Sequence, residues 1–421
     1  MCVDSDRDAL VLMSTLVEPG NADVAHTINT YGPIEALDRL LAPGDSTAHR
    51  SAVARLGRDS IRGRLEQVTS ATQECGARVL TEEDEEWPVR LADLSQLHDE
   101  SEPHSAAPRC LWVRGDSDLA EVTARSVSIV GARACSWYGK HVATQLAHDL
   151  ADRGWGVLSG GAYGIDAAAH RGALAAEGNT VAVLASGVDR PYPAGHDRLF
   201  DSIRQRGLLV SEWPPGSIPQ RHRFLVRNRV IAAMSMGTVV VEAAIRSGAR
   251  QTARKAKELE RTLMLVPGSV TSAASAGVHQ LAREPGEVRI VTRAAEIIED
   301  VGDIGSDLAP PLPGETRPQD LFTTLEYRLW DAAPRKHGAT ADEIAAQAGI
   351  AGIEARRVLP GLARDGHLEF IDGRYRQPVL SSCASGRYRH GRDDTGQTQT
   401  VIRRRNRFRE AGYLVYPIPR R

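Results

Sequence analysis

Residues 157–167 read Val157-Leu158-Ser159-Gly160-Gly161-Ala162-Tyr163-Gly164-Ile165-Asp166-Ala167. An apolar run here passes through a cluster of glycines into an alanine-rich stretch, the pattern of a buried strand that turns directly into a helix. Backbone N–H groups of such a turn can approach a phosphate, and the following helix adds the positive end of its dipole. We therefore predict a phosphate-binding loop at Ser159, Gly160 and Gly161, with a tight turn that binds no ligand as the alternative. For Asp166 an N-cap role is favoured.

Similar apolar runs recur on both sides of this turn, at intervals of roughly 25 to 30 residues that leave room for a crossover helix. The runs are continuous and do not alternate with polar residues, which is typical of strands buried on both faces of a parallel sheet. They predict an α/β fold, with a Rossmann-like, doubly wound parallel sheet over residues 126–303. The runs lie at 127–130, 157–158, 181–184, 208–210, 239–241 and 263–266.

The segments before this domain differ in pattern. Residues 1–75 have weak helical periodicity, with apolar-periodic stretches at 9–17 and 33–41, and predict a small N-terminal helical domain similar to a SAM or helix-hairpin-helix domain. Residues 76–125 are expected to form an extension and a linker, because 97–108 is polar and contains proline.

After a proline-rich linker at 304–320, residues 321–378 predict a winged helix. Thr340 and Glu343 have the spacing of a capping box, and Asp372-Gly373 is the dipeptide preferred in a tight hairpin turn. Three helical stretches and a hairpin together indicate the winged fold. Pro360 lies inside the third helical stretch, which we therefore expect to be kinked or short.

Composition excludes several classes of protein. The 421 residues carry a formal charge of −2, and the five cysteines include no C-x-x-C pair, so neither a disulfide scaffold nor a zinc ribbon is indicated. No apolar run is long enough to span a membrane, and the expected compartment is the cytoplasm. A nucleic-acid site must come from local clustering of arginines. The arginine-rich tail at 379–421 could bind DNA or could equally be a solvated tail.

The densest arginine cluster within the sheet domain is Arg221-His222-Arg223-Phe224-Leu225-Val226-Arg227-Asn228-Arg229. On a helix, Arg221, Phe224 and Asn228 share one face, whereas Arg223 and Arg227 share another. A base stacked on Phe224, with guanidinium groups at the flanking phosphates, is a usual arrangement for single strands. The alternative, with Phe224 in the core and the arginines solvated, stays open.

No catalytic constellation is evident. The turn at Gly131-Ala132-Arg133 lacks the G-x-G-x-x-G spacing of a dinucleotide site, which disfavours dehydrogenases. Glu242 is the best candidate for a buried acid, but no second carboxylate stands beside it, and we expect it to pair with Arg227 or Arg229. We predict a protein without enzymatic activity, cofactor or metal. The alternative is a nucleotide-processing enzyme of the phosphoribohydrolase type that uses Glu242.

These segments together resemble the DprA (Smf) family of DNA-processing proteins over most of the chain. The departures are Gly161 and Tyr163, where the family more often has Leu and Arg, and Ala249 after Ser247-Gly248, where it usually has Ser. The matching motifs are Ile129 to Arg133, Leu158 to His170, Ala182-Val183-Leu184 with Tyr192-Pro193, Ser211 to Gly216, Phe224 with Arg227 to Ala232, Val240 to Ala243, Thr252-Ala253 and Val266-Pro267-Gly268.

The resemblance implies a dimeric protein that binds and protects single-stranded DNA and loads the RecA recombinase onto it in natural transformation. In the family, the Arg of the Gly-x-Arg turn, a basic residue three before the Phe, the Phe and the Ser-Gly loop contact DNA. These positions are Arg133, Arg221, Phe224 and Ser159-Gly160 in this chain. The whole set that we predict to bind nucleic acid is Arg133, Ser159, Gly160, Gly161, Arg221, Phe224, Arg227, Asn228, Arg229 and Thr252.

Overall fold

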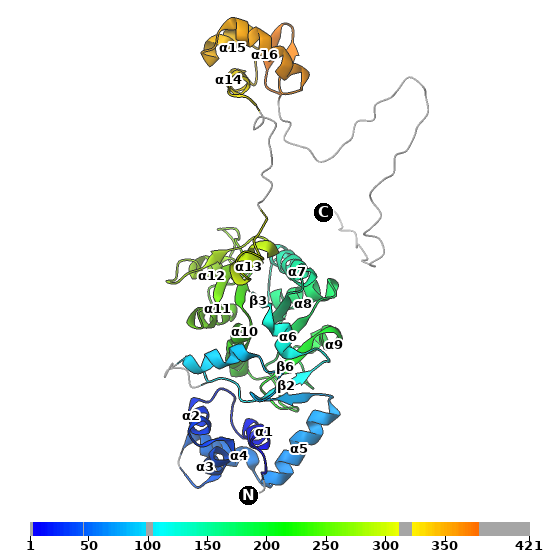
Figure 1. Cartoon of the computed structure of the whole chain (residues 1–421), viewed down its shortest axis with the longest axis vertical. Coiled ribbons are helices and arrows are strands. Elements are labelled where there is room, and N and C mark those ends of the chain that lie inside the picture. The colour runs from blue at the N-terminus through cyan, green and yellow to red at the C-terminus, as the bar shows by residue number, and fades with distance from the viewer. Residues whose placement is uncertain (1–2, 45, 98–103, 311–321, 379–421) are drawn as a thin grey trace, which may run out of the picture. The chain divides into compact units, whose positions relative to one another are not determined.

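The computed structural model describes residues 3–44, 46–97, 104–310 and 322–378. They form two compact units, one that extends to residue 310 and one that begins at 322 (Figure 1). Residues 311–320 of the expected linker and the tail at 379–421 lie outside the described residues. No helix in the described ranges is long and apolar enough to cross a bilayer.

The first unit contains one nine-stranded sheet. Its strands are β1 (Arg78–Leu80), β2 (Leu111–Arg114), β3 (Ser126–Val130), β4 (Gly156–Ser159), β5 (Thr180–Val183), β6 (Leu208–Ser211), β7 (Gly237–Val240), β8 (Thr262–Leu265) and β9 (Arg289–Ile290). They lie in the order β1-β2-β6-β5-β4-β3-β7-β8-β9. From β6 to β9 every neighbouring pair is parallel, which confirms the predicted doubly wound sheet.

Helices cover both faces of the sheet, because its strands are apolar on both sides. One face packs against α6 (Leu119–Ala124), α10 (Arg221–Met234), α11 (Ala249–Glu258) and α12 (Ala276–Leu281). The other packs against α7 (Trp137–Asp152), α8 (Ile165–Ala175), α9 (Asp197–Arg206) and α13 (Ala294–Val301). Figure 1 shows α7 and α8 on one side of β3, with α10 and α11 on the other.

The order of the strands creates a switch point between β3 and β7. From β3 the chain builds β4, β5 and β6 to one side, and α10 then carries it back to β7 on the other side of β3. The helix after β3 covers one face and the helix after β7 covers the opposite face. In sheets of this kind, ligands bind where the two connections diverge, at the carboxyl ends of the strands.

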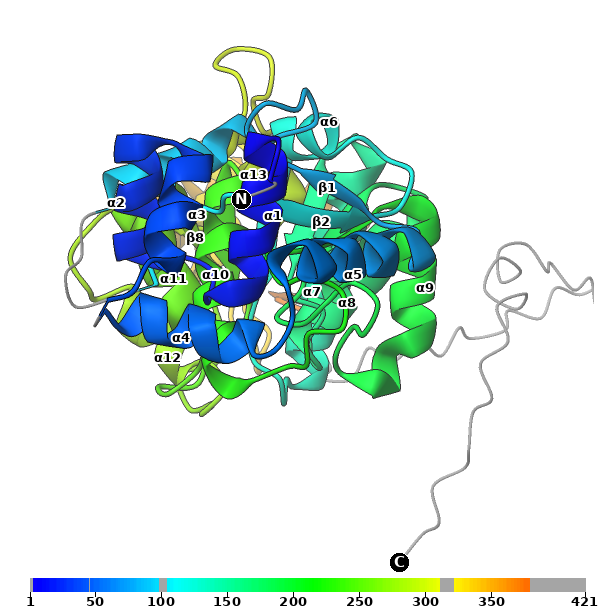
Figure 2. The ribbon, with the colours of Figure 1, turned by 90° about the horizontal axis from the view of Figure 1, so that it is seen from below.

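The predicted N-terminal helical region is present. It consists of α1 (Asp6–Leu16), α2 (Ala22–Tyr31), α3 (Pro33–Leu41), α4 (Thr47–Leu56) and α5 (Ile61–Glu74). These helices have a core of their own, and α5 also packs on β2, where the indole N–H of Trp112 donates to the hydroxyl of Thr72 at 3.1 Å. Figure 2 shows these helices in blue beside β1 and β2. The SAM or helix-hairpin-helix type stays a prediction.

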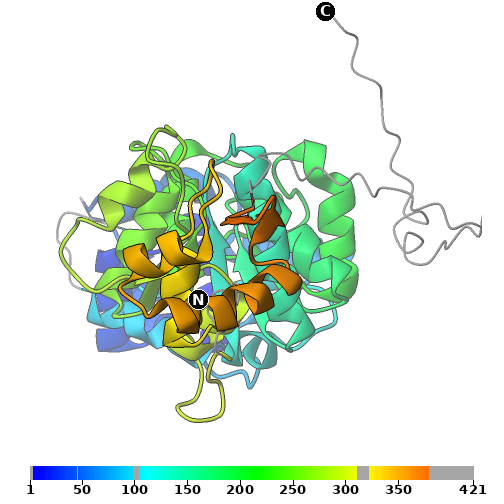
Figure 3. The same cartoon turned by 90° about the horizontal axis from the view of Figure 1, so that it is seen from above.

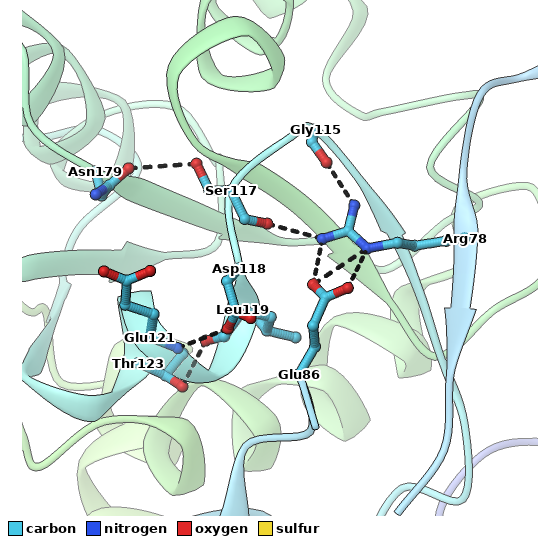
Figure 4. Close-up of polar contacts among 9 residues, drawn as sticks. All are labelled: Arg78, Glu86, Gly115, Ser117, Asp118, Leu119, Glu121, Thr123 and Asn179. Carbon is cyan, nitrogen blue, oxygen red and sulfur yellow. Dashed lines mark hydrogen bonds and ion pairs between the residues drawn. The ribbon is translucent and has the colours of Figure 1, made fainter. Parts of the chain in front are cut away.

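Residues 76–125 do more than link, because they add β1, β2, the 3-10 helix η1 (Val89–Gln96) and α6 to the unit. The sequence pattern did not predict the two strands. They pair antiparallel with each other, and β2 also pairs antiparallel with β6. Arg78 locks this extension together, since its guanidinium pairs with Glu86 at 2.5 Å and donates to the carbonyls of Gly115 and Ser117 (Figure 4).

The second unit has the elements of the predicted winged helix: α14 (Thr324–Ala332), α15 (Ala341–Ala348), α16 (Gly352–Arg364), β10 (Glu369–Ile371) and β11 (Arg374–Arg376), with the hairpin in dark orange in Figure 3. The capping box of Thr340 and Glu343 is confirmed. Asp372 and Gly373 both have positive φ, as a type I′ turn requires. The third helix is not short, because α16 continues through Pro360, and a kink at Pro360 stays a prediction.

Candidate nucleic-acid interface

The predicted arginine helix is α10, and it begins at Arg221. Arg221 is exposed and Phe224 is half-buried, whereas Arg223 and Arg227 are buried, so the two pairs differ in exposure. Asn228, expected on the face of Phe224, is also buried. The arginines of this helix therefore divide into one that faces solvent and three that lie inside the fold.

Phe224 lies among side chains from two other elements, and together they form an accessible aromatic and cationic cluster. Arg133 follows β3 and is exposed, and its guanidinium carbon lies 5.0 Å from the centre of the Phe224 ring. Tyr192, in the loop after β5, meets the same ring edge-on at 5.8 Å between centroids and is 46% exposed. These distances are those of cation–π and aromatic pairs. The cluster can offer a flat stacking surface beside a positive charge.

Arg221 lies three residues before Phe224 on α10. Within the described ranges it makes no hydrogen bond and no ion pair, so no carboxylate of these ranges neutralises its charge. Tyr163, in the glycine loop, is a further exposed aromatic residue and packs edge-on against His196 at 4.5 Å. The prediction omitted Tyr163 and Tyr192. An aromatic residue in the loop directly after a buried strand was the available signal.

A side chain of the protein itself occupies N–H groups of the glycine loop. The carboxylate of Asp166 accepts from the N–H groups of Gly160 at 3.2 Å and Ala162 at 3.4 Å. The hydroxyl of Ser159 donates to the carbonyl of Ile129. Asp166 is not the N-cap of α8, because Gly164, with φ of 83°, takes that position. The N–H of Gly160, which was expected to receive a phosphate, therefore already has an acceptor, and so does the N–H of Ala162.

Arg227, a buried residue of α10, also binds the glycine loop. Its guanidinium donates to the carbonyl of Gly160 at 2.8 Å and to that of Val183. Burial lowers the pKa of Arg227 to about 10, and the nearby Asp166 carboxylate opposes this change. A Cβ atom at residue 160 would lie 2.4 Å from this guanidinium, and one at Gly161, whose φ is 68°, would lie 2.6 Å from the Phe200 ring. Glycine is thus required at both positions by packing.

The remaining predicted residues are also inside the fold. Arg229 pairs with Glu212 at 2.6 Å, and both side chains are at most 3% exposed. The amide of Asn228 donates to the carbonyl of Gly248 at 3.4 Å, and Thr252 is buried. Of the predicted set, Arg133, Arg221 and Phe224 are accessible. A direct DNA contact by the others stays a prediction.

Glu242 has a different partner from the one expected. Its carboxylate accepts from the backbone N–H of Ser136 at 2.8 Å and from the Ser136 hydroxyl at 2.5 Å, at the start of α7. The expected pairing with Arg227 or Arg229 is wrong, because those arginines bind the loop carbonyls and Glu212. In the parts of the chain that the structure describes, no group of three His, Cys, Asp or Glu side chains is placed to hold a metal ion.

The chain matches a known protein family. The family model of DNA recombination-mediator protein A matches residues 78–302. A Mycobacterium tuberculosis protein assigned to the DprA DNA-processing proteins is 44% identical over 377 residues, which is 89% of this chain and 95% of that protein. The DNA processing protein DprA of Streptococcus pneumoniae is 36% identical over 49% of this chain and 70% of its own length.

A solved structure of a member of the same family has a similar fold. The crystal structure of DNA processing protein A from Streptococcus pneumoniae aligns with a TM-score of 0.56 and 27% identity, and the match covers 72% of this chain and 100% of that chain. The match of the family model covers the whole sheet from β1 to β9 and reaches the end of α13. The chain belongs to the DprA (Smf) family of DNA recombination-mediator proteins.

Proposed function

We propose that this protein binds single-stranded DNA at the cluster of Arg133, Phe224 and Tyr192 and loads RecA recombinase onto the bound strand in the cytoplasm, in recombination and natural transformation. The observation that carries the proposal is the contact of the Arg133 guanidinium with the Phe224 ring at 5.0 Å, at the carboxyl ends of the strands. Its membership of a family of recombination mediators supports the same function.

The chemistry of the cluster suits a single strand better than a duplex. Bases of a single strand expose their faces, which can stack on Phe224 or Tyr192, and stacking tolerates any base. Bases in a duplex are already stacked and present only their edges and the phosphates. Arg133 contacts the Phe224 ring, and Arg221 lies three residues before Phe224 on α10 without an ion pair in the described ranges. Both guanidinium groups would hold the phosphates of the stacked nucleotide.

Fluorescence anisotropy of the full chain with labelled oligo-dT and with a duplex of equal length tests this proposal. We expect the single strand to bind more tightly and binding to weaken as salt increases. Arg133→Ala and Arg221→Ala should each weaken single-strand binding. Arg153→Ala is the matched control, because this exposed arginine is the C-cap of α7 and lies just before β4, near the amino ends of the strands. Unchanged binding in both test variants would remove the site.

RecA loading and the homodimer need separate measurements. We expect the protein to accelerate assembly of RecA on single strands already coated by a single-strand-binding protein, and Phe224→Ala to lose this acceleration together with DNA binding. Sedimentation equilibrium tests the dimer, for which we expect twice the mass of the chain. Acceleration that survives the loss of DNA binding would contradict the proposed order of events.

We propose binding without chemistry, so no free base should be released from nucleoside monophosphates. The phosphoribohydrolase alternative gains no support from Glu242, because among the described residues no second carboxylate and no histidine lines the pocket around it. Base release that disappears in Glu242→Gln would reverse this conclusion.

A further inference from the structure

A pocket of about 430 Å³ lies at the switch point of the sheet, and the DNA-binding cluster does not use it. Ser136 opens α7 after β3, Glu242 follows β7, and Pro267-Gly268 follows β8, so the pocket sits where ligands bind in such folds. Its size is within the range of small-molecule sites. The lining residues are Ser136, Tyr138, Glu242, Pro267, Gly268, Ser269, Ser272 and Ser275.

Two buried polar side chains converge on this pocket. Glu242 is 2% exposed, and its only donors among the described residues are the N–H and hydroxyl of Ser136, which leaves capacity for further donors. Ser275 is 3% exposed, and its hydroxyl has no hydrogen-bond partner within the described ranges. Because Ser275 lines the pocket, its hydroxyl is free to donate to or accept from a molecule bound there.

The backbone approaches both polar groups closely at a glycine. A Cβ atom on Gly268 would lie 2.2 Å from the Ser275 hydroxyl oxygen, so a residue larger than glycine would clash with it. A Cβ atom on Gly139 would likewise lie 2.3 Å from the Glu242 carboxylate. Glycine at these two positions therefore lets the backbone pack directly against both polar groups, and a side chain at either position would displace the group from its place.

The charge of the lining excludes an anionic group in the pocket. None of the lining residues is Lys, Arg or His, and the Glu242 carboxylate would repel a phosphate. A carboxylate and a hydroxyl instead suit the hydroxyl groups of a sugar, the role that an acidic residue has toward ribose in Rossmann domains. Tyr138 adds an aromatic wall, which is 44% exposed and is held by a hydrogen bond from its hydroxyl to the carbonyl of Pro267.

From this geometry we infer that the pocket binds a nucleoside through its free sugar hydroxyls, with Glu242 and Ser275 at the sugar and Tyr138 against the base. Such a nucleoside can be a free ribonucleoside or the 3′-terminal nucleoside of a nucleic-acid strand, and the hydroxyl that both present is the 3′-hydroxyl. The inference does not rest on the proposed function, because no residue of the Arg133 cluster lines the pocket.

Isothermal titration of the full chain with adenosine, and with 2′,3′-dideoxyadenosine as the matched ligand, tests the inference. We expect adenosine to bind and the dideoxy analogue to bind about tenfold more weakly or worse, because it leaves buried polar groups unpaired. Equal affinity for the two ligands, or no binding of either at millimolar concentration, would overturn the inference. Oligonucleotides that end in a 3′-hydroxyl or a 3′-dideoxy nucleotide separate the two sources.

Variants locate the binding. Ser275→Ala should weaken adenosine roughly 2- to 10-fold, the effect of one lost hydrogen bond. Ser272→Leu fills the pocket from a half-buried loop position without removing either polar group and should abolish binding. Ser202→Ala, on α9, is the control. Melting temperatures verify folding, and unchanged affinity in both pocket variants would overturn the assignment. Oligo-dT binding by Ser275→Ala should equal that of the parent, which keeps this test separate from the DNA site.

Discussion

Arg221 and Arg229 stand two turns apart on α10, yet the structure uses them in opposite ways. Arg221 is exposed and makes no ion pair in the described part of the chain. Arg229 is 2% exposed, pairs with Glu212 and donates through Nε to the carbonyl of His104. The comparison teaches that a cluster of arginines does not by itself mark a nucleic-acid surface. Burial and the presence of an internal acceptor decide which charges remain available to a ligand.

The buried arginines of α10 connect this helix to distant parts of the chain. Arg223 donates to the carboxylate of Glu18 at 2.7 Å, and Glu18 also accepts from Arg55 and from the indole of Trp213. The adjacent Phe224 is in the proposed DNA surface. The N-terminal helical region therefore helps to hold the DNA-binding helix, although no predicted DNA contact lies in it.

Arg229→Met should have the largest effect on stability in this comparison. Removing the guanidinium leaves the buried Glu212 carboxylate without its counter-ion, which costs about 3–5 kcal/mol. Urea unfolding measures the loss. Arg221→Met is the matched control, the same substitution on the same helix, and should change the free energy of unfolding by less than about 0.5 kcal/mol. Equal losses in the two variants would break the distinction.

Phe224→Ala should have the largest effect on binding. Loss of one stacked base costs about 1–3 kcal/mol of binding free energy. Anisotropy with oligo-dT measures it, and the melting temperature should fall only slightly because Phe224 is half-buried. Phe224→Tyr keeps the aromatic face and should bind as the parent does. A variant with leucine at this position that bound equally well would point to apolar packing in place of stacking.

Arg221→Ala should change how single-strand binding depends on the salt concentration. Each phosphate contact on a single strand contributes about −0.7 to the slope of log affinity against log salt, so the slope should become shallower by about that amount. Arg153→Ala should leave the slope unchanged. A steeper or equal slope in Arg221→Ala would show that this exposed arginine does not meet a phosphate.

Glu18→Gln should change the pH dependence of stability. Three donors lower the pKa of Glu18 from 4.5 to about 2, against the opposing effect of burial, which is the largest single contribution. A lowered pKa stabilises the folded state above pH 4.5, and this contribution disappears as the pH falls from 4.5 toward 2. The difference in stability between the parent and Glu18→Gln should therefore shrink over that interval in acid titrations of urea unfolding.

The strands β3 to β8 were predictable because each coincides with a continuous apolar run, whereas β9 was not, because Arg289-Ile290 contains no such run. β1 was not predictable either, since Arg78-Val79-Leu80 is three residues long and becomes a strand only by pairing with β2. The arginine-rich helix was predictable, but the burial of three of its arginines, Arg223, Arg227 and Arg229, was not. Their acceptors are far away in sequence: Glu18 is 205 residues from Arg223.

The glycine loop shows the same limit in a different form. The cluster of glycines correctly indicated a sharp turn from β4 into α8, but the sequence pattern could not tell a ligand phosphate from the chain's own carboxylate. Asp166, six residues after Gly160, supplies that carboxylate. Arg227 then holds the carbonyl of Gly160 from another helix, a contact that depends on the crossing of α10 over the sheet.

The sheet ends at β1 on one side and at β9 on the other, and these strands have three and two residues. Without β1 and β2, the outer side of β6 would be an open edge with unpaired N–H and carbonyl groups, the kind of template on which other chains aggregate. Very short terminal strands offer little backbone for such growth. Self-association by edge-to-edge addition of strands is therefore disfavoured. The helical faces are the better candidates for a dimer surface.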